Sequence, residues 1–479
     1  MENTPHWLTP VPVQDTSPIQ QPRTGHGQQI LQSPLHTQVV AAKNEIDRIA
    51  PAGQWDDAKK ITNTYEYIFL SLQRRTHDSV SAKLPLSRSY FKMIEIWNLL
   101  GLCTALPQRT AHTAEGPGGF LEAIQERTGG STPMTAMTLR STERTIPGWR
   151  KSAAFLSKHP AVNITYGADG TGNLYHLANQ DYFTQTAGAA ANDLYTADGG
   201  FDFSADFNGQ ENTVQRLLVA ETLAGLTTLR PVAASTMILK IFDTTHRATL
   251  ELLWILSTVF ERTALIKPHT SRPANSERYW VGVGYRGAPA WVTTLLRELT
   301  ATEAPTGWDT IFAEPPWTPA WLATVTDFQT ALETVQLAKI QLTLNIIKST
   351  TREQIRSLLV ENIRNSRAWC QRNGVPINPS YATLTDETIA ARNLEEALAP
   401  FQASVVRMSL QALSQRGQTP RASTSVLPPR PLAAPAWRSA IPPSVLGRSP
   451  SHTAGASPSS PPSAPQPSPQ ESDHEPDTP

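Results

Sequence analysis

The sequence has few of the features that mark secreted or membrane proteins. Its 479 residues include two cysteines, Cys103 and Cys370, too few for a disulfide framework or a multi-cysteine zinc site. This scarcity fits a reducing compartment. The longest apolar stretch, 250–260, contains Glu251 and is much shorter than the ~20 residues that cross a bilayer. The N-terminal MENTPHWLTPVPVQ lacks the basic and apolar regions of a signal peptide. We therefore expect neither a membrane span nor a signal peptide.

The sequence also has no excess charge of either sign. Its 41 Lys and Arg residues balance 41 Asp and Glu residues, so any surface that binds RNA has to be a local basic patch. No metal site is expected, because His112, His246 and His269 are isolated in the sequence. We interpret these three histidines as structural or exposed.

Proline is abundant but unevenly spread, with 16 of the 40 prolines in residues 420–479. Segments rich in Pro, Ser, Gln and Thr bury too little apolar surface to offset the entropy of ordering. The expected organisation is a disordered tail at 1–35, a helical extension at 36–85, an α/β domain at 86–290, a helical extension at 291–417 and a disordered tail at 418–479.

Between 86 and 290, short apolar runs alternate with amphipathic patterns. Expected strands cover 109–114, 134–140, 193–197, 236–242, 264–267 and 279–283, and expected helices cover 86–102, 120–127, 213–229 and 246–262. Alternation at this spacing predicts an α/β domain with a largely parallel sheet.

Two loops of this domain carry candidate ligand-binding residues. The sequence EGPGGF at 115–120 follows an expected strand and opens an expected helix, where glycines let a ligand approach the backbone N–H groups. The alternative is a tight turn without a ligand. Asp198 follows the strand that ends at Ala197, and ligands of open α/β sheets lie at the carboxyl ends of strands. The alternative is an aspartate that only shapes the turn.

Two further segments place charges at strands. Lys240 interrupts the apolar run TMILKIFD, and burying an ammonium group is costly unless it is paired. The alternative is a lysine on an edge strand that extends into solvent. The segment SRPANSER at 271–278 brings a carboxylate and two guanidinium groups to a strand start, although a salt-bridged loop explains that segment equally well.

Taken together, these motifs and their order resemble the FtsJ-like RNA 2′-O-methyltransferase family. Within that family the chain is most similar to the eukaryotic-type cap-specific mRNA (nucleoside-2′-O-)-methyltransferases. The resemblance covers 55–290 well and 291–380 more loosely, and it is carried by TNTYEYIF at 62–69, SRSYFKM at 87–93, EGPGGF, ADGGF at 197–201, NGQEN at 208–212, LKIFD at 239–243 and KPHTSRPANSERY at 267–279. It implies a Rossmann-like S-adenosylmethionine-dependent methyltransferase sheet with flanking helical extensions and disordered tails.

The resemblance also implies roles for particular residues. The catalytic tetrad would be Lys92, Asp198, Lys240 and Glu277. S-adenosylmethionine would be held by Glu115, Gly116, Pro117, Gly118, Gly119, Phe120, Asp169, Gly170 and Asn173. The chain departs from the family at Asn173, where an acidic residue is frequent. Capped RNA would contact Lys267, Arg272 and Asn275, with Lys59, Lys60, Arg74 and Arg75 as candidates that equally fit solvated helix faces.

The implied reaction is transfer of a methyl group to the ribose 2′-hydroxyl of the first transcribed nucleotide of N7-methylguanosine-capped mRNA. A 2′-hydroxyl is a weak nucleophile, so it needs a base or a cation that stabilises the developing alkoxide. Lys240 would supply that group. Lys92 pushes the pKa of Lys240 down and the two tetrad carboxylates push it up, so the sequence leaves the net direction open.

Two other functions fit parts of the sequence. One is 2′-O-methylation of ribosomal or other internal RNA, and the other is a non-catalytic RNA-binding module on a degenerate methyltransferase fold. The Pro/Ser-rich tail could bind protein partners as an extended segment. A nuclear location is expected by resemblance, with the cytoplasm as the alternative for a viral enzyme.

Overall fold

A mixed eight-stranded sheet with parallel strands at its centre organises the part of the chain that the structure describes. The computed structural model describes residues 4–14, 16–31, 34–49, 53–70, 79–102, 104–143, 146–201, 209–399 and 401. The strand order is β1-β8-β9-β7-β6-β3-β4-β5, and the pairs from β7 to β5 are parallel. The strands are β1 (His6–Trp7), β3 (Thr110–Thr113), β4 (Met134–Met137), β5 (Val162–Thr165), β6 (Leu194–Ala197), β7 (Thr236–Ile241), β8 (Phe260–Ile266) and β9 (Arg278–Tyr285).

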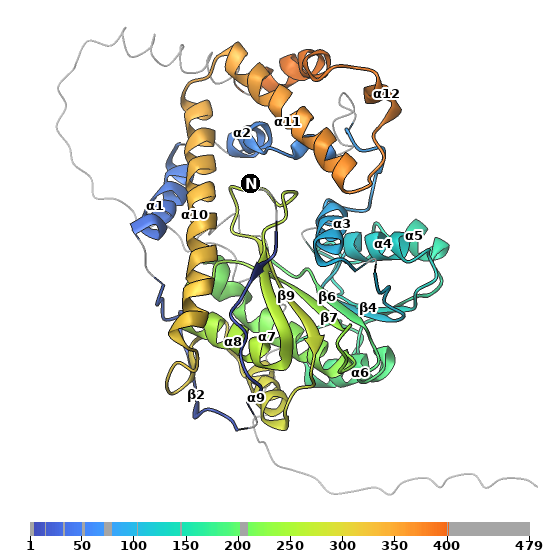
Figure 1. Ribbon diagram of the computed structural model, residues 1–479, viewed down its shortest axis with the longest axis vertical. Helices are drawn as coiled ribbons and strands as arrows, with labels where there is room; N and C mark the ends of the chain where they lie inside the picture. The colour runs from blue at the N-terminus through green and yellow to red at the C-terminus, as the bar shows by residue number, and fades with distance from the viewer. Residues whose placement is uncertain are drawn as a thin grey trace, which may run out of the picture. The chain divides into compact units, whose positions relative to one another are not determined.

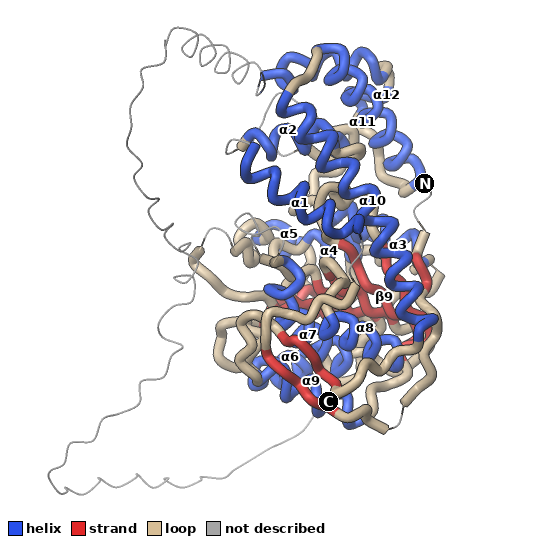
Figure 2. The backbone as a smooth tube through the Cα atoms, turned by 90° about the vertical axis from the view of Figure 1, so that its left-hand side faces the viewer, coloured by secondary structure: helices blue, strands red, loops and turns tan. Residues whose placement is uncertain are grey.

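Helices cover both faces of this sheet (Figures 1 and 2). In the first apolar core, residues of α3 and α4 pack on Ile238 and Val281 of the strands. In the second core, residues of the four helices α6, α7, α8 and α9 pack on Met237 and Leu239. The helices are α1 (Pro34–Ile49), α2 (Gln54–Thr62), α3 (Ser89–Leu100), α4 (Gly119–Arg127), α5 (Ala153–Lys158), α6 (Leu177–Ala187), α7 (Gln210–Thr228), α8 (Arg247–Val259), α9 (Ala290–Ala301), α10 (Pro319–Lys348), α11 (Arg352–Arg372) and α12 (Pro379–Ala382).

The alternation of side chains along β7 decides where Lys240 points. Successive strand residues face opposite sides of a sheet. Met237, Leu239 and Ile241 belong to the core under α7 and α8, whereas Ile238 belongs to the core under α3. Lys240 therefore shares the face of Ile238 and directs its ammonium toward α3.

The strand order changes direction between β3 and β6. Thr113 at the end of β3 lies opposite Ala197 at the end of β6. The glycine-rich segment that begins at Glu115 and the loop that begins at Asp198 thus start side by side. This is the switch point at which open α/β sheets bind ligands.

The helices outside the sheet domain pack on one another. The long helix α10 lies against α1 and α2, and α2 also contacts α11, an arrangement visible in Figure 1. Within the region for which only helices are expected, Trp308–Phe312 forms the strand β10 and pairs with β2 (Gln20–Thr24). No helix among the described residues is long and apolar enough to cross a membrane.

The expectation of a disordered N-terminal tail over 1–35 is wrong for the described residues of that segment. β1 pairs with the edge of β8, and the Leu8 amide donates to the Thr263 carbonyl at 2.8 Å. Leu8 and Val11 are buried in the second core. A strand of two residues is too short to produce a sequence period. The expected tail at 418–479, Arg74, Arg75 and Cys103 lie outside the described residues.

We expect Leu8→Ala to destabilise the protein by about 2–5 kcal/mol, the usual cost of deleting a buried leucine side chain. Leu8 is 5% exposed. Ile19 lies in the same segment but is 79% exposed, so Ile19→Ala is the matched control and should change stability by less than about 0.5 kcal/mol. Chemical denaturation measures both. Equal, small effects would mean that the N-terminal segment does not belong to the folded core.

Candidate active site

The four residues expected as a tetrad lie together as two ion pairs. Lys92 of α3 binds Glu277 with Nζ–Oε distances of 2.7 and 2.8 Å. Lys240 donates to the Asp198 carbonyl at 2.7 Å and lies 3.3 Å from the Asp198 carboxylate. Each of these side chains is between 12 and 14% exposed, so the ammonium groups are largely withdrawn from water but still accessible to a ligand.

Tyr279 is a fifth member of this group that the sequence analysis did not assign. It lies directly opposite Lys240 in the β7–β9 pair, and it is fully buried. Its hydroxyl donates to the Asp198 carboxylate at 2.8 Å. Tyr279 and Lys240 therefore hold Asp198 from two neighbouring strands. Its position two residues after Glu277, inside a buried strand, was the available signal.

The charges of the site shift the pKa values of Lys240 and Glu277 in opposite directions. Burial alone would lower the pKa of Lys240, but Asp198, Glu277 and Glu221 outweigh burial and raise it. Burial alone would raise the pKa of Glu277, but Lys92, Lys240 and Lys267 hold it well below its usual value. The charges of the site thus favour the ammonium form of Lys240 and the carboxylate form of Glu277.

Glu115 offers an unused acceptor at the switch point. Its carboxyl is buried, and one oxygen accepts a hydrogen bond from the Thr196 hydroxyl. The other oxygen, Oε2, has no partner among the described residues. Burial and the nearby Asp198 raise the pKa of Glu115 well above its usual value. A buried polar atom without a partner is rare in native proteins, so Glu115 suits a ligand that brings a hydrogen-bonding group.

The glycines of the adjoining loop are needed for close backbone approaches. A side chain on Gly116 would press on the backbone of Gly148, and one on Gly119 would clash with the hydroxyls of Ser87 and Ser89. Gly118 has φ of 103° at the start of α4. Gly119 thus serves the packing of α4 on α3, while Gly116 and Gly118 shape the turn around Pro117.

Phe120 is placed differently from the expectation that it binds the cofactor. Its side chain is fully buried, and its ring lies 5.8 Å from the ring of Tyr279 in the core. A residue at the second position of α4 points into the sheet rather than toward the loop that precedes the helix. Phe120 therefore packs against the Tyr279 ring in the core.

Asp169 and Asn173 lie in the loop after β5, where their hydrogen bonds close the loop on itself. Asp169 accepts from Thr171, His176 and Asn179, and these bonds outweigh partial burial and hold its pKa well below the usual value. Asn173 accepts from the Tyr175 amide at 2.9 Å. The neighbouring Gly172 lies against the Thr138 carbonyl at the end of β4, so this loop borders the same edge of the sheet.

The three residues expected to contact RNA have different surroundings. Lys267 donates to the Asn275 carbonyl and side-chain oxygen and to the Glu277 carbonyl, so it holds the loop that carries Glu277 rather than facing outward. Burial and neighbouring cations lower its pKa to about 7. Arg272 forms a bidentate pair with the buried Glu66. Arg272 and Asn275 also line a pocket.

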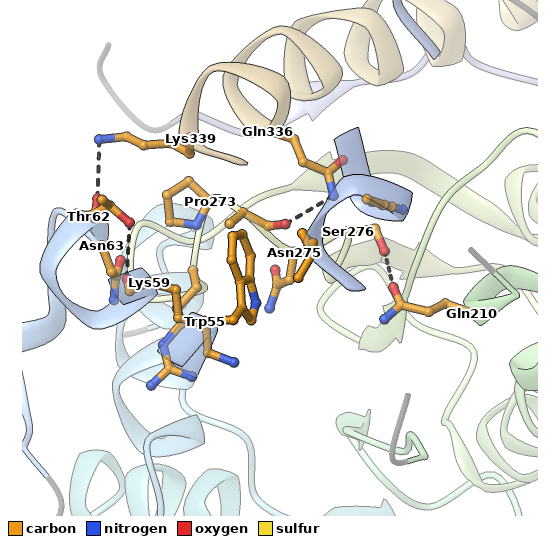
Figure 3. Close-up of a pocket in the computed structure, with 14 residues that line it drawn as sticks. Trp55, Lys59, Thr62, Asn63, Gln210, Pro273, Asn275, Ser276, Gln336 and Lys339 are labelled. Atoms are coloured by element: carbon orange, nitrogen blue, oxygen red, sulfur yellow. Dashed lines mark hydrogen bonds between the residues drawn. The ribbon is translucent and has the colours of Figure 1, made fainter. Parts of the chain in front are cut away.

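This pocket, shown in Figure 3, lies between α1, α2, α10 and the 272–276 segment, and its volume is about 110 Å³. Figure 3 shows the Trp55 indole among its lining side chains, with Lys59 and Asn275 drawn on either side. Lys43, Lys59, Arg272 and Lys339 give the wall four cationic groups. Sequence reasoning did not rank Trp55 because the residues of this pocket come from four distant segments.

The described residues contain no group of three His, Cys, Asp or Glu side chains suited to a metal ion. His112 is fully buried, and its two ring nitrogens lie 2.7 and 2.8 Å from the hydroxyls of Thr110 and Thr196. Burial lowers its pKa to about 3, so His112 is a neutral core histidine.

Residues 85–285 match the family model of the FtsJ-like methyltransferases. This segment carries all four tetrad positions and is similar to the FtsJ-like methyltransferases. The chain is 32% identical over 215 residues to "Cap-specific mRNA (nucleoside-2′-O-)-methyltransferase 1" of Trypanosoma cruzi, a match covering 42% of this chain and 58% of that protein.

Two other relatives match over different lengths. The protein of the same name from Dictyostelium discoideum is 28% identical over 293 residues, which are 56% of this chain and 36% of that protein. "Probable methyltransferase EP424R" of African swine fever virus is 43% identical over 89 residues, 19% of this chain and 20% of that protein. The chain thus covers less than two thirds of the length of each of these relatives.

We expect Glu277→Gln to destabilise the protein by about 3–5 kcal/mol at pH 7, because it leaves the Lys92 ammonium without its buried partner. The lowered pKa of Glu277 means that its stabilising contribution is present above about pH 4.5 and is lost as the pH falls. The difference in unfolding free energy between wild type and Glu277→Gln should therefore shrink below pH 4.5. Denaturation at several pH values measures it.

The exposed Glu303 provides the matched control for this pH dependence. Glu303→Gln should leave both the stability and its pH profile unchanged. A difference between wild type and Glu277→Gln that stays constant down to pH 3 would contradict the ion pair.

Proposed function

We propose that the chain is an S-adenosylmethionine-dependent RNA methyltransferase that modifies the ribose 2′-hydroxyl of the first transcribed nucleotide of capped mRNA. The observation that carries this proposal is the pairing of Lys240 with Asp198 beside Lys92 and Glu277, at the switch point of an FtsJ-like domain. The names of the relatives from Trypanosoma cruzi and Dictyostelium discoideum support the cap as the substrate.

The switch-point residues fit S-adenosylmethionine. The unpartnered Oε2 of Glu115 is an acceptor for a ligand donor, and the turn at Gly116 and Gly118 permits close approach to the backbone. When bound, S-adenosylmethionine supplies an electrophilic methyl group. The loop that contains Asp169 and Asn173 borders the same edge and would form a second wall.

The charge of Lys240 defines its first role. As an ammonium, it can donate a hydrogen bond to the 2′-oxygen and stabilise the negative charge that develops there. Asp198, which accepts a hydrogen bond from Tyr279, holds Lys240 at a fixed place, so little reorganisation is required during the reaction. Lys240 acts as a base only if substrate binding lowers its pKa, since the ligand-free site raises it.

The pocket around Trp55 fits the 5′ end of a capped RNA. An aromatic face can stack on a methylated guanine, and lysine and arginine side chains can bind the phosphates. Lys339 donates to neutral oxygens of Thr62 and Thr64, so its charge is available to a phosphate. Asn275 and Ser276 of the lining stand directly before Glu277, which links this pocket to the tetrad. The compartment, nuclear or cytoplasmic, stays a prediction.

The first test is transfer of labelled methyl to three short RNAs: one with an N7-methylguanosine cap, the same RNA uncapped, and a capped RNA already 2′-O-methylated at its first nucleotide. We expect transfer to the first RNA alone. Lys240→Ala should lower the rate on the order of 10²–10⁴-fold, whereas the exposed Lys158→Ala should not.

Other outcomes of this test separate the alternatives. Equal transfer to uncapped RNA would favour ribosomal or internal RNA as the substrate. No transfer by wild type, with S-adenosylmethionine binding also absent by calorimetry, would favour a non-catalytic RNA-binding module.

We expect Trp55→Ala to raise KM for capped RNA about tenfold and to leave kcat nearly unchanged, because stacking of a base contributes about 1–3 kcal/mol. Trp317→Ala, which removes an indole stacked on Trp321 away from the pocket, is the matched control. Steady-state kinetics with capped and uncapped RNA measure the effect. An unchanged KM for Trp55→Ala would remove this pocket from cap binding.

A further inference from the structure

Glu221 is a buried carboxyl close to the tetrad that has no part in the mechanism described so far. It lies in the middle of α7 and is 1% exposed, among apolar neighbours that include Leu218 and Leu223. One of its oxygens, Oε1, has no hydrogen-bond partner among the described residues. A buried carboxyl without such a partner is costly, so its place calls for an explanation.

The side chain of Glu221 lies against the turn that follows β6. The Glu221 carboxyl lies directly beside the backbone of Gly199. A Cβ atom on Gly199 would clash with Glu221 Oε1 and lie 2.8 Å from a methyl group of Leu217. Glu221 and Leu217, one helical turn apart on α7, thus form the surface on which this turn rests.

The opposite side of the same turn touches Lys240. The Asp198 carbonyl accepts from Lys240 Nζ at 2.7 Å, and a Cβ atom on Gly200 would lie 3.2 Å from that Nζ. The backbone of the turn therefore separates the carboxyl of Glu221 from the ammonium of Lys240. Any movement of the turn toward α7 would withdraw the carbonyl that Lys240 binds.

We propose that Glu221 is a positioning residue of the tetrad: its buried carboxyl fixes the turn from Asp198 to Gly200, and through that turn the place of the Lys240 ammonium. This inference rests on the proposed 2′-O-methyl transfer for its consequence in catalysis. Its structural part, the contact of Glu221 with the turn at Gly199, stands on the geometry alone.

The charge state of Glu221 adds a consequence for pH. Burial, opposed by Lys240, raises the pKa of Glu221 to about 8. At neutral pH the carboxyl is uncharged, so Asp198 and Glu277 are the carboxylates that balance Lys92 and Lys240. Above pH 8 Glu221 ionises, and the added negative charge stabilises the ammonium form of Lys240, as the direction of its influence on Lys240 indicates.

The kinetic test compares Glu221→Ala and Glu221→Gln with wild type in single-turnover methyl transfer to capped RNA. We expect Glu221→Ala to slow transfer about tenfold, because the turn that positions Lys240 loses its support. Glu221→Gln keeps the size and shape of the side chain against Gly199 and should restore most of the rate.

A matched control separates positioning from general stability. Glu251 is also a fully buried glutamate with a raised pKa, but it binds Arg247 and the Ile311 amide, remote from the tetrad. Glu251→Gln should lower the melting temperature and leave the rate of transfer by the folded protein unchanged. If both Glu221 variants behave like Glu251→Gln, the proposal is overturned.

Hydrogen exchange provides a readout that does not depend on activity. Exchange of the Gly199 amide should accelerate at least tenfold in Glu221→Ala and stay near the wild-type rate in Glu221→Gln. An unchanged exchange rate in Glu221→Ala would overturn the proposal even if no RNA is methylated. Absence of transfer by wild type with the expected exchange pattern would instead refute the proposed function alone.

Discussion

The pairing of Lys240 with Asp198 is the interaction on which the rest of the site depends. An ammonium group on a strand between two apolar cores is stable only if neighbouring groups offset its desolvation. Asp198 does so with both its carbonyl and its carboxylate. Tyr279 then holds the carboxylate, Phe120 packs on the Tyr279 ring, and α4 carries Phe120 next to the glycine-rich loop. A continuous series of contacts thus links the buried Lys240 ammonium to the candidate cofactor loop.

Two buried carboxylates connect the helices outside the sheet domain to the same site. Glu66, in the short 3₁₀ helix after α2, pairs with Arg272 and Arg88. Glu95, one turn after Lys92 on α3, accepts from the amides of His269 and Thr270 and from the Trp369 indole of α11. Both carboxylates bind the 269–272 segment, Glu66 through Arg272 and Glu95 through the amides of His269 and Thr270. The helical extensions therefore do more than cover the domain, because they fix the loop that leads to Glu277.

The sequence predicted those features that follow from local pattern and strand order. The central strands and their flanking helices were expected from local pattern and spacing. The convergence of Lys92, Asp198, Lys240 and Glu277 was implied by the resemblance to the FtsJ-like family. The roles of the tetrad residues stay predictions. β1 and β10 were missed, since a strand of two residues and a strand inside a helical region have little pattern of their own.

The residues that escaped prediction depend on contacts between distant segments. Trp55 becomes part of a pocket only when α10 and the 272–276 loop approach α2. Lys267, for which the resemblance implies an RNA contact, donates hydrogen bonds to the Asn275 and Glu277 carbonyls, which only the folded loop brings within its reach. Glu221 did leave a trace, a carboxyl within an apolar helical stretch, but its meaning depends on Gly199 on another element.

The 272–277 segment connects the pocket directly to the tetrad. Arg272 and Asn275 line the pocket, while Glu277 binds Lys92, and Lys267 ties Asn275 to the Glu277 backbone. A ligand that moves the pocket end of this short segment must also move the carboxylate at its other end. In the proposed function, binding of the cap would therefore adjust the position of Glu277 as well as anchor the RNA. Selectivity for capped RNA could then be expressed in the rate of transfer in addition to affinity, since an uncapped RNA would leave the segment unsupported.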